Sequence, residues 1–133
     1  MIVLDTHALL WMDRNDASLG AQSRRLIEDA WWTDTVAVSA ISFWEVAMLA
    51  QRGRIVLPVA VEILRADLLQ AGIQEISING RIAMLAASFH NLYRDPADRF
   101  IVATAMQHEA LLVTADSKIL EWQADLGRQD ARV

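Results

Sequence analysis

Short apolar runs alternate along the chain with longer segments in which apolar residues recur at helical spacing. Three runs have the length and β-prone composition of buried strands: Ile2–Leu4, Val36–Val38 and Leu111–Thr114. They are apolar throughout instead of alternately polar, which is typical of strands covered on both faces of a parallel sheet. The alternation of such strands with helices predicts an α/β domain with a mainly parallel central sheet.

Helix signals fill the segments between these strands. Asp95 and Pro96 are a typical N-cap and first helical residue, and Asp98 then heads an apolar stripe that continues through Ile101 and Val102. Six other helices are expected. Three have bounds set by their apolar pattern or by Pro and Gly: Leu19 to Trp32, Pro58 to Gly72, and Ser117 to Trp122. The other three are identified by their N-caps: Thr6, Ser42 (with the helix running to Ala50) and Asn79. Two short pieces are candidate edge strands: Gln74–Ser77 and Ala131–Val133.

Length and composition narrow the class of protein. A chain of 133 residues suits one domain, 1–133, because it can bury one sizeable core but not two. The absence of cysteine excludes a disulfide scaffold and a thiolate metal site. The first residues lack the features of a signal peptide, and no apolar run approaches the ~20 residues of a membrane helix. We therefore expect a cytoplasmic globular protein with no membrane partner.

The net charge of −5 bears on nucleic-acid binding. A protein that holds nucleic acid by bulk electrostatics is normally basic, so that class is disfavoured. An enzyme whose acidic site is neutralised by a bound cation is not excluded by this charge.

Four carboxylates occupy positions that a parallel sheet brings to one edge. Asp5 and Asp116 follow the ends of strands, while Glu45 and Asp98 lie in the first turns of expected helices. Each has a structural explanation when taken alone; Glu45, for instance, has capping-box spacing from Ser42, which is the favoured interpretation of that segment by itself. Four carboxylates on one edge repel one another unless a cation offsets their charge. All-oxygen coordination favours Mg²⁺ or Mn²⁺, and such sites typically act on phosphates.

Two other functions are compatible with aspartates at strand ends. A receiver-like phosphoacceptor domain would need a second acid beside Asp5, where Thr6 stands, and a lysine at the end of a late strand, where Lys118 is misplaced. A non-catalytic protein-binding module is the other alternative. The three histidines show no ligand spacing, so surface or core positions are expected for His7, His90 and His108.

Four motifs spanning nearly the whole chain resemble the PIN-domain ribonucleases, in particular the VapC-like toxins of type II toxin–antitoxin systems. They are IVLDTHALLW (2–11), SAISFWE (39–45), RDPADRFIVA (94–103) and LVTAD (112–116), in the family's order and spacing. The resemblance implies a three-layer α/β/α PIN-like fold and a Mg²⁺-dependent endoribonuclease, with Mn²⁺ also possible. It further implies an RNA substrate, a cognate antitoxin protein and a homodimer.

The resemblance also implies roles for individual residues. By position, the catalytic and metal-binding residues would be Asp5, Glu45, Asp98 and Asp116, supported by the hydroxyl of Thr114. Two positions depart from the family pattern: Tyr93 stands where histidine is common, and Ala97 where an aromatic residue is frequent. These changes remove no carboxylate, but they could alter contacts with substrate or partner.

The aromatic residues predict a partner surface. One small core cannot hold all of the apolar side chains of the first, second and third expected helices, and aromatic residues and methionine are what interfaces concentrate. We expect part of this surface to form a groove for an amphipathic antitoxin helix, with exposed rings among Trp11, Trp31, Trp32 and Trp44.

Overall fold

The computed structural model describes residues 1–92 and 95–133. Within these residues five strands form one sheet: β1 (Ile2–Leu4), β2 (Val36–Ser39), β3 (Gln74–Ile76), β4 (Leu111–Thr114) and β5 (Arg128–Asp130). The strand order is β3-β2-β1-β4-β5, and every neighbouring pair is parallel. The predicted parallel sheet is therefore confirmed, with β1 at its centre.

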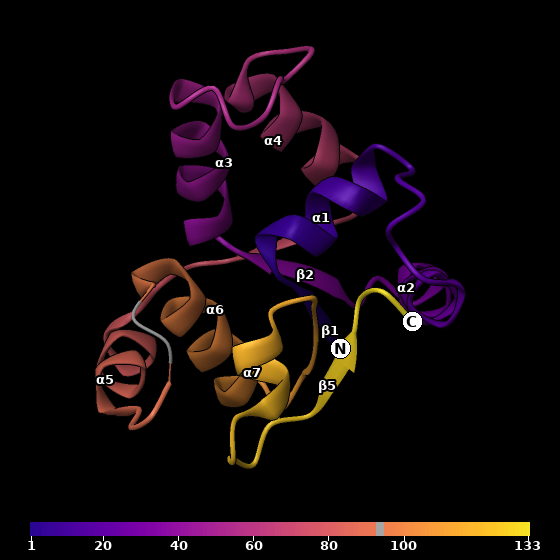
Figure 1. The fold of residues 1–133 in the computed structure, drawn as a ribbon. Coiled ribbons are helices and arrows are strands. Elements are labelled where there is room, and N and C mark those ends of the chain that lie inside the picture. The colour runs from indigo at the N-terminus through magenta and orange to yellow at the C-terminus, as the bar shows by residue number, and fades with distance from the viewer. Residues whose placement is uncertain (93–94) are drawn as a thin grey trace.

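Helices cover both faces of the sheet, which confirms the three-layer α/β/α architecture (Figure 1). In Figure 1, α1, α3 and α4 lie above the sheet and α5, α6 and α7 below it. The helices are α1 (Thr6–Asp13), α2 (Ala21–Trp32), α3 (Ile41–Gln51), α4 (Val61–Gln70), α5 (Gly80–Ser88), α6 (Pro96–Gln107) and α7 (Ser117–Glu121). None of the helices in the described part of the chain is long and apolar enough to cross a membrane.

The two faces of β1 show how the apolar runs build two cores. Ile2 and Leu4 belong to a cluster with buried residues of α1, α2, α3 and α4, while Val3, between them, packs with residues of α6 and α7. Successive side chains of a strand point to opposite faces, so an uninterrupted apolar run fills both cores. The outer helix α5 packs on α6 through a smaller cluster that includes Ile82, Ala86 and Ala103.

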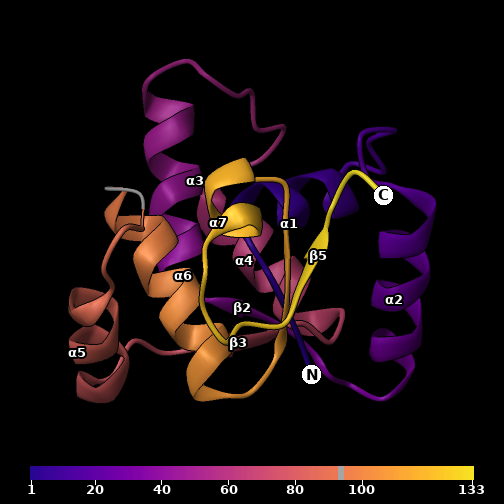
Figure 2. The ribbon, with the colours of Figure 1, turned by 60° about the horizontal axis from the view of Figure 1, so that its bottom comes forward.

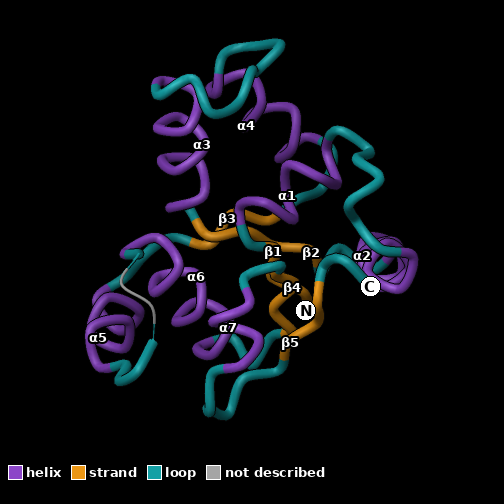
Figure 3. Tube along the Cα trace, in the orientation of Figure 1, coloured by secondary structure: helices purple, strands orange, loops and turns teal. Residues whose placement is uncertain are grey.

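All strand-to-helix connections that carry the predicted carboxylates leave the sheet at one edge. The chain passes from β1 into α1, from β2 into α3 and from β4 into α7 within one or two residues (Figure 3). Figure 2 shows the start of β1 at the bottom and the β4–α7 connection at the top, so the carboxyl ends of the strands lie together. This is the edge at which open α/β sheets bind ligands.

The two largest differences from the expected element boundaries are the start of α4 and the position of the last strand. The helix expected from Pro58 begins at Val61, because the preceding Leu57 packs against the main core in a non-helical segment. The last strand is Arg128–Asp130 instead of Ala131–Val133. Residues 131–133 turn instead onto the start of α2, where Gly20 donates its backbone N–H to the Ala131 carbonyl at 2.8 Å.

Candidate active site

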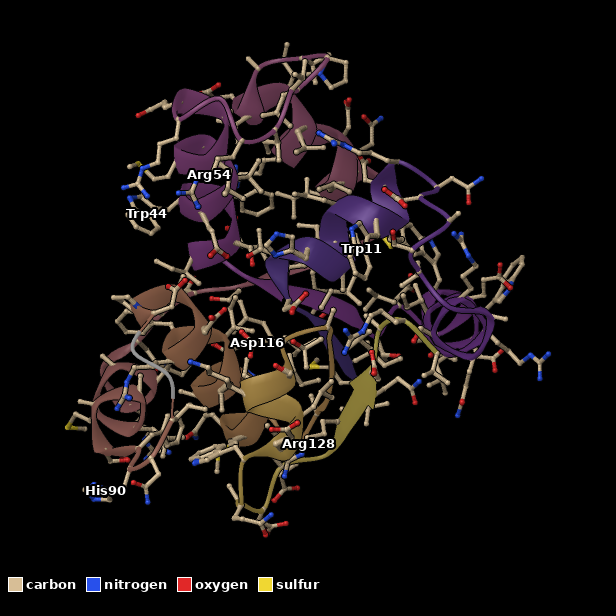
Figure 4. The ribbon with its side chains drawn as sticks, viewed as in Figure 1. Trp11, Trp44, Arg54, His90, Asp116 and Arg128 are labelled. Carbon is tan, nitrogen blue, oxygen red and sulfur yellow. The ribbon has the colours of Figure 1, made fainter. Side chains whose placement is uncertain are left out.

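A cavity of about 350 Å³ opens at the carboxyl edge of the sheet. Its lining contains all four carboxylates expected from the sequence, together with a fifth, Asp95. Figure 4 shows Trp11 on α1 and Asp116 at the exit of β4, with the centre of this edge between them. The full lining is Asp5, His7, Trp11, Glu45, Asp95, Asp98, Ala115 and Asp116.

Asp5 is buried at the junction of β1 and α1, and both of its carboxylate oxygens accept hydrogen bonds. Oδ1 accepts the backbone N–H of Ala8 at 2.7 Å, which makes Asp5 the N-cap of α1 in place of the expected Thr6. Oδ2 accepts the hydroxyl of Thr114 at 2.5 Å. Burial raises the pKa of Asp5, and these hydrogen bonds oppose that rise.

Thr114 connects two of the carboxylates. Its hydroxyl donates to Asp5 and accepts the backbone N–H of Asp116 at 3.1 Å. Asp116 in turn caps α7, because its Oδ1 accepts the backbone N–H groups of Lys118 and Ile119. The hydroxyl therefore holds the ends of β1 and β4 in register at the cavity, a geometry that fits the supporting role expected for Thr114.

Glu45 lies in the second turn of α3, and the capping box expected for it is wrong. The helix begins at Ile41, whose N–H is accepted by the hydroxyl of Ser39 at 3.2 Å. Ser42 lies inside the helix, buried, where its hydroxyl accepts a hydrogen bond from Thr6 at 3.1 Å. The Glu45 carboxylate lines the cavity, and burial, followed by the charges of nearby aspartates, raises its pKa.

The start of α6 places two further carboxylates in the cavity. Asp95 caps the helix as expected, with Oδ1 accepting the N–H of Ala97 at 3.0 Å, and Pro96 is the first helical residue. Asp98 is half-buried, and burial raises its pKa to about 8, helped by repulsion from Asp95, Glu45, Asp116 and Asp5. Such a large rise shows that the described surroundings of Asp98 do not compensate its negative charge.

The next residue, Arg99, does not supply that compensation. Its guanidinium donates to the carbonyls of Ala86 at 3.0 Å and Phe89 at 2.9 Å. Arg99, in the first turn of α6, thus caps the C-terminal end of α5. These hydrogen bonds support the fold and do not involve the carboxylates of the cavity. Among the described residues lining the cavity there is no arginine or lysine.

The carboxylates have the chemistry and spacing of a site for a hard divalent cation. Glu45, Asp95 and Asp98 each offer an oxygen, and these oxygens lie within 4.8 Å of one another. Oxygens bound to one Mg²⁺ are at most about 4.2 Å apart, so small side-chain movements suffice. The donor set is entirely carboxylate, which fits Mg²⁺ or Mn²⁺ better than zinc.

Sequence reasoning missed three polar or aromatic residues of this cavity. The sequence explains Asp95 fully as a helix cap. Its place beside Glu45 depends on the packing of α6 against α3 and is not visible in its own segment. His7 was expected on an unrelated surface or in the core, and it lies on the cavity wall with Trp11, one helical turn later. His7 and Trp11 are spaced i, i+4 in the helix that follows Asp5, and this spacing was the available signal.

The two departures from the family pattern have different outcomes. Ala97 is fully buried in the first turn of α6. Tyr93 lies outside the described residues.

Comparisons with known proteins identify the family of this sequence. The sequence matches the PIN domain family over residues 2–123. It is 34% identical over 119 residues to the ribonuclease VapC22 of Mycobacterium tuberculosis. The aligned region covers 89% of this chain and 88% of that protein.

Solved structures share the fold at low sequence identity. A toxin–antitoxin complex from Klebsiella pneumoniae superposes with a TM-score of 0.66 at 20% identity, covering 98% of both chains. VapBC2 from Rickettsia felis, bound to a DNA fragment from its promoter, gives 0.70 at 17% identity, covering 97% of this chain and 98% of that one. With its motifs, sheet order and acidic edge in place, this chain belongs to the PIN-domain family.

Proposed function

We propose that the protein is a metal-dependent endoribonuclease that acts as the toxin of a toxin–antitoxin pair in the cytoplasm. The observation that carries the proposal is the convergence of five carboxylates on one cavity, in a chain 34% identical to a ribonuclease over most of its length. We assign catalysis and metal binding to Asp5, Glu45, Asp98 and Asp116, add Asp95 to the ligand set, and assign support to Thr114.

A bound Mg²⁺ or Mn²⁺ would supply an activated water and charge stabilisation at the scissile phosphate. The residues would hold and orient that centre. Glu45, Asp95 and Asp98 offer oxygens within 4.8 Å of one another, and Asp5 and Asp116, connected through Thr114, line the same cavity. Asp98 must lose its proton to act as a ligand, because its pKa is about 8 without a cation.

The direct test is RNA cleavage by the chain purified free of any partner. We expect cutting of a structured RNA in millimolar Mg²⁺ or Mn²⁺, loss of cutting in EDTA, and recovery when excess cation returns. The control is EDTA already saturated with cation, which should not inhibit. Cleavage that persists in EDTA would rule out the metal mechanism.

The proposed antitoxin site is an apolar groove between α1 and α2. This cavity of about 550 Å³ is lined by Met12, Leu19, Ile27, Trp31 and Trp32, with polar residues at its rim. Trp31 packs against the core, whereas the Trp32 side chain is 88% exposed. An exposed ring beside an aliphatic groove fits the apolar face of an amphipathic helix. The groove and the acidic cavity share α1, so one partner segment can reach both.

Trp32→Ala is expected to weaken inhibition by the antitoxin, the small protein that we expect to be encoded beside this gene. Loss of an anchoring ring costs at least about 2 kcal/mol, or roughly 30-fold in affinity, when the ring is a hot spot. The measurement is the antitoxin concentration that halves RNA cleavage, with cleavage by the free variant unchanged.

Met84→Ala is the matched control, because Met84 is an exposed apolar side chain on α5, in the opposite layer. If Trp32→Ala and Met84→Ala were inhibited equally well, the groove would not be the antitoxin site. We also propose that the toxin forms the homodimer implied by the family resemblance, and light scattering of the toxin alone, on the same samples, tests this.

A further inference from the structure

Trp11 is the only tryptophan, tyrosine or phenylalanine among the described residues that line the acidic cavity, where the smaller imidazole of His7 is the other ring. Trp11 is half-buried: the ring packs against the main core cluster and also contributes to the cavity wall. The core contacts hold the ring in place, while its cavity side remains accessible, so the ring offers a rigid surface. Packing alone does not account for an indole placed among five carboxylates.

The charges around this ring determine what it can hold. The protein carries a net charge of −5, and five of its acidic residues line this cavity, whose described lining contains no arginine or lysine. A divalent cation attracts one phosphate, but the flanking nucleotides are left near an acidic surface. Stacking of a base on an aromatic ring does not depend on charge, and it contributes about 5- to 150-fold in affinity per base.

The cavity has room for one nucleotide. Its volume of about 350 Å³ lies at the lower end of the range of roughly 300–1,000 Å³ for small-molecule sites. A paired base cannot stack on a cavity wall without leaving its helix, so the occupant would be an unpaired nucleotide.

We propose that Trp11 is the stacking platform for the base of a nucleotide beside the scissile phosphate. The inference rests on the proposed ribonuclease function and adds a substrate-binding residue to it. Trp11 positions the substrate by contact with its base, while the carboxylates act on its phosphate. Replacement of the ring should therefore raise KM more than it lowers kcat.

The test compares Trp11→Phe and Trp11→Leu on a synthetic RNA oligonucleotide that spans the cut site of the wild type. Leucine keeps an apolar side chain but has no π face, so KM should rise by about 5- to 150-fold. Trp11→Phe keeps an aromatic ring, so the KM of this variant should stay close to that of the wild type. Mn²⁺ is expected to raise the melting temperature of the wild type by binding its carboxylates. It should raise that of both variants equally, because no carboxylate is changed. Trp44→Leu is the matched control, since the Trp44 ring is 53% exposed and lies outside the described lining of the cavity.

An abasic scan of the same oligonucleotide shows whether the partner of the ring is a base. Removing one particular base should raise the wild-type KM as much as Trp11→Leu does, and combining the two changes should add nothing. If the leucine variant does not fold, Trp11→Met serves instead, because methionine is also apolar and has no aromatic ring.

The outcomes separate this inference from the proposed function. A Trp11→Leu variant with wild-type KM, or fully additive effects of ring and base removal, would overturn the stacking role alone. A wild-type chain that cuts no RNA would overturn the ribonuclease function and the stacking role together.

Discussion

Asp98→Asn is expected to slow RNA cleavage by roughly 10³-fold while raising the melting temperature of the metal-free protein at pH 8 and above. The rate falls because asparagine loses the charge that holds the cation, which contributes several kcal/mol at the transition state. Stability rises because Asp98 ionises near this pH against its burial and the repulsion of four other carboxylates, and the neutral amide avoids both costs. Single-turnover cleavage and thermal unfolding measure the two effects.

Asp29→Asn is the matched control, because Asp29 is exposed on α2, away from the cavity. It should change neither quantity. An Asp98→Asn variant that cuts at the wild-type rate would remove Asp98 from the metal site. A variant that is inactive and also less stable would mean that Asp98 has a structural role.

The free energy of unfolding of the metal-free protein is expected to fall as pH rises from about 4 to about 8. The ordinary pKa of Asp98 is 3.8, and its pKa in the folded protein is about 8. Between these values the unfolded chain has released its proton and the folded chain has kept it, so each increase in pH favours unfolding. Asp5 and Glu45 act in the same direction, since burial raises the pKa of both.

A divalent cation should reverse this trend. It competes with protons for the same carboxylates, so millimolar Mg²⁺ or Mn²⁺ should stabilise the protein more at about pH 8 than at about pH 5. Urea unfolding with and without cation measures the difference, and Asp98→Asn should flatten the metal-free dependence. A metal-free stability that increased over this pH range would contradict the proposed crowding of the carboxylates.

The architecture was predictable because its signals are local. Three apolar runs without polar alternation identify the central strands; Asp5 directly follows the first of them, and Asp116 comes two residues after the last. Strand β5 could not be found in this way, because its residues, Arg-Gln-Asp, are polar and it is recognised only by its pairing with β4. Family membership also sets aside the receiver-like alternative, which requires a different arrangement of acids and lysine.

The parts of the site that escaped prediction depend on contacts between distant segments. Ser42 and Glu45 have the spacing of a capping box, but Ser42 instead bonds to Thr6, 36 positions earlier, and the helix starts before it. Asp95 satisfies a local rule completely as a cap, so nothing in its segment indicates a second position. Only the packing of α3 beside α6 brings Glu45 near Asp95.

Asp5, Asp95 and Asp116 cap α1, α6 and α7, and this double use bears on the timing of toxicity. A cap is made when its helix forms, so the acidic centre is assembled by the act of folding and needs no maturation step. On the proposed function, a newly synthesised toxin would become active as soon as it folds and binds cellular magnesium. Only antitoxin that is already present would then protect the cell, so the antitoxin should be made before the toxin and in excess.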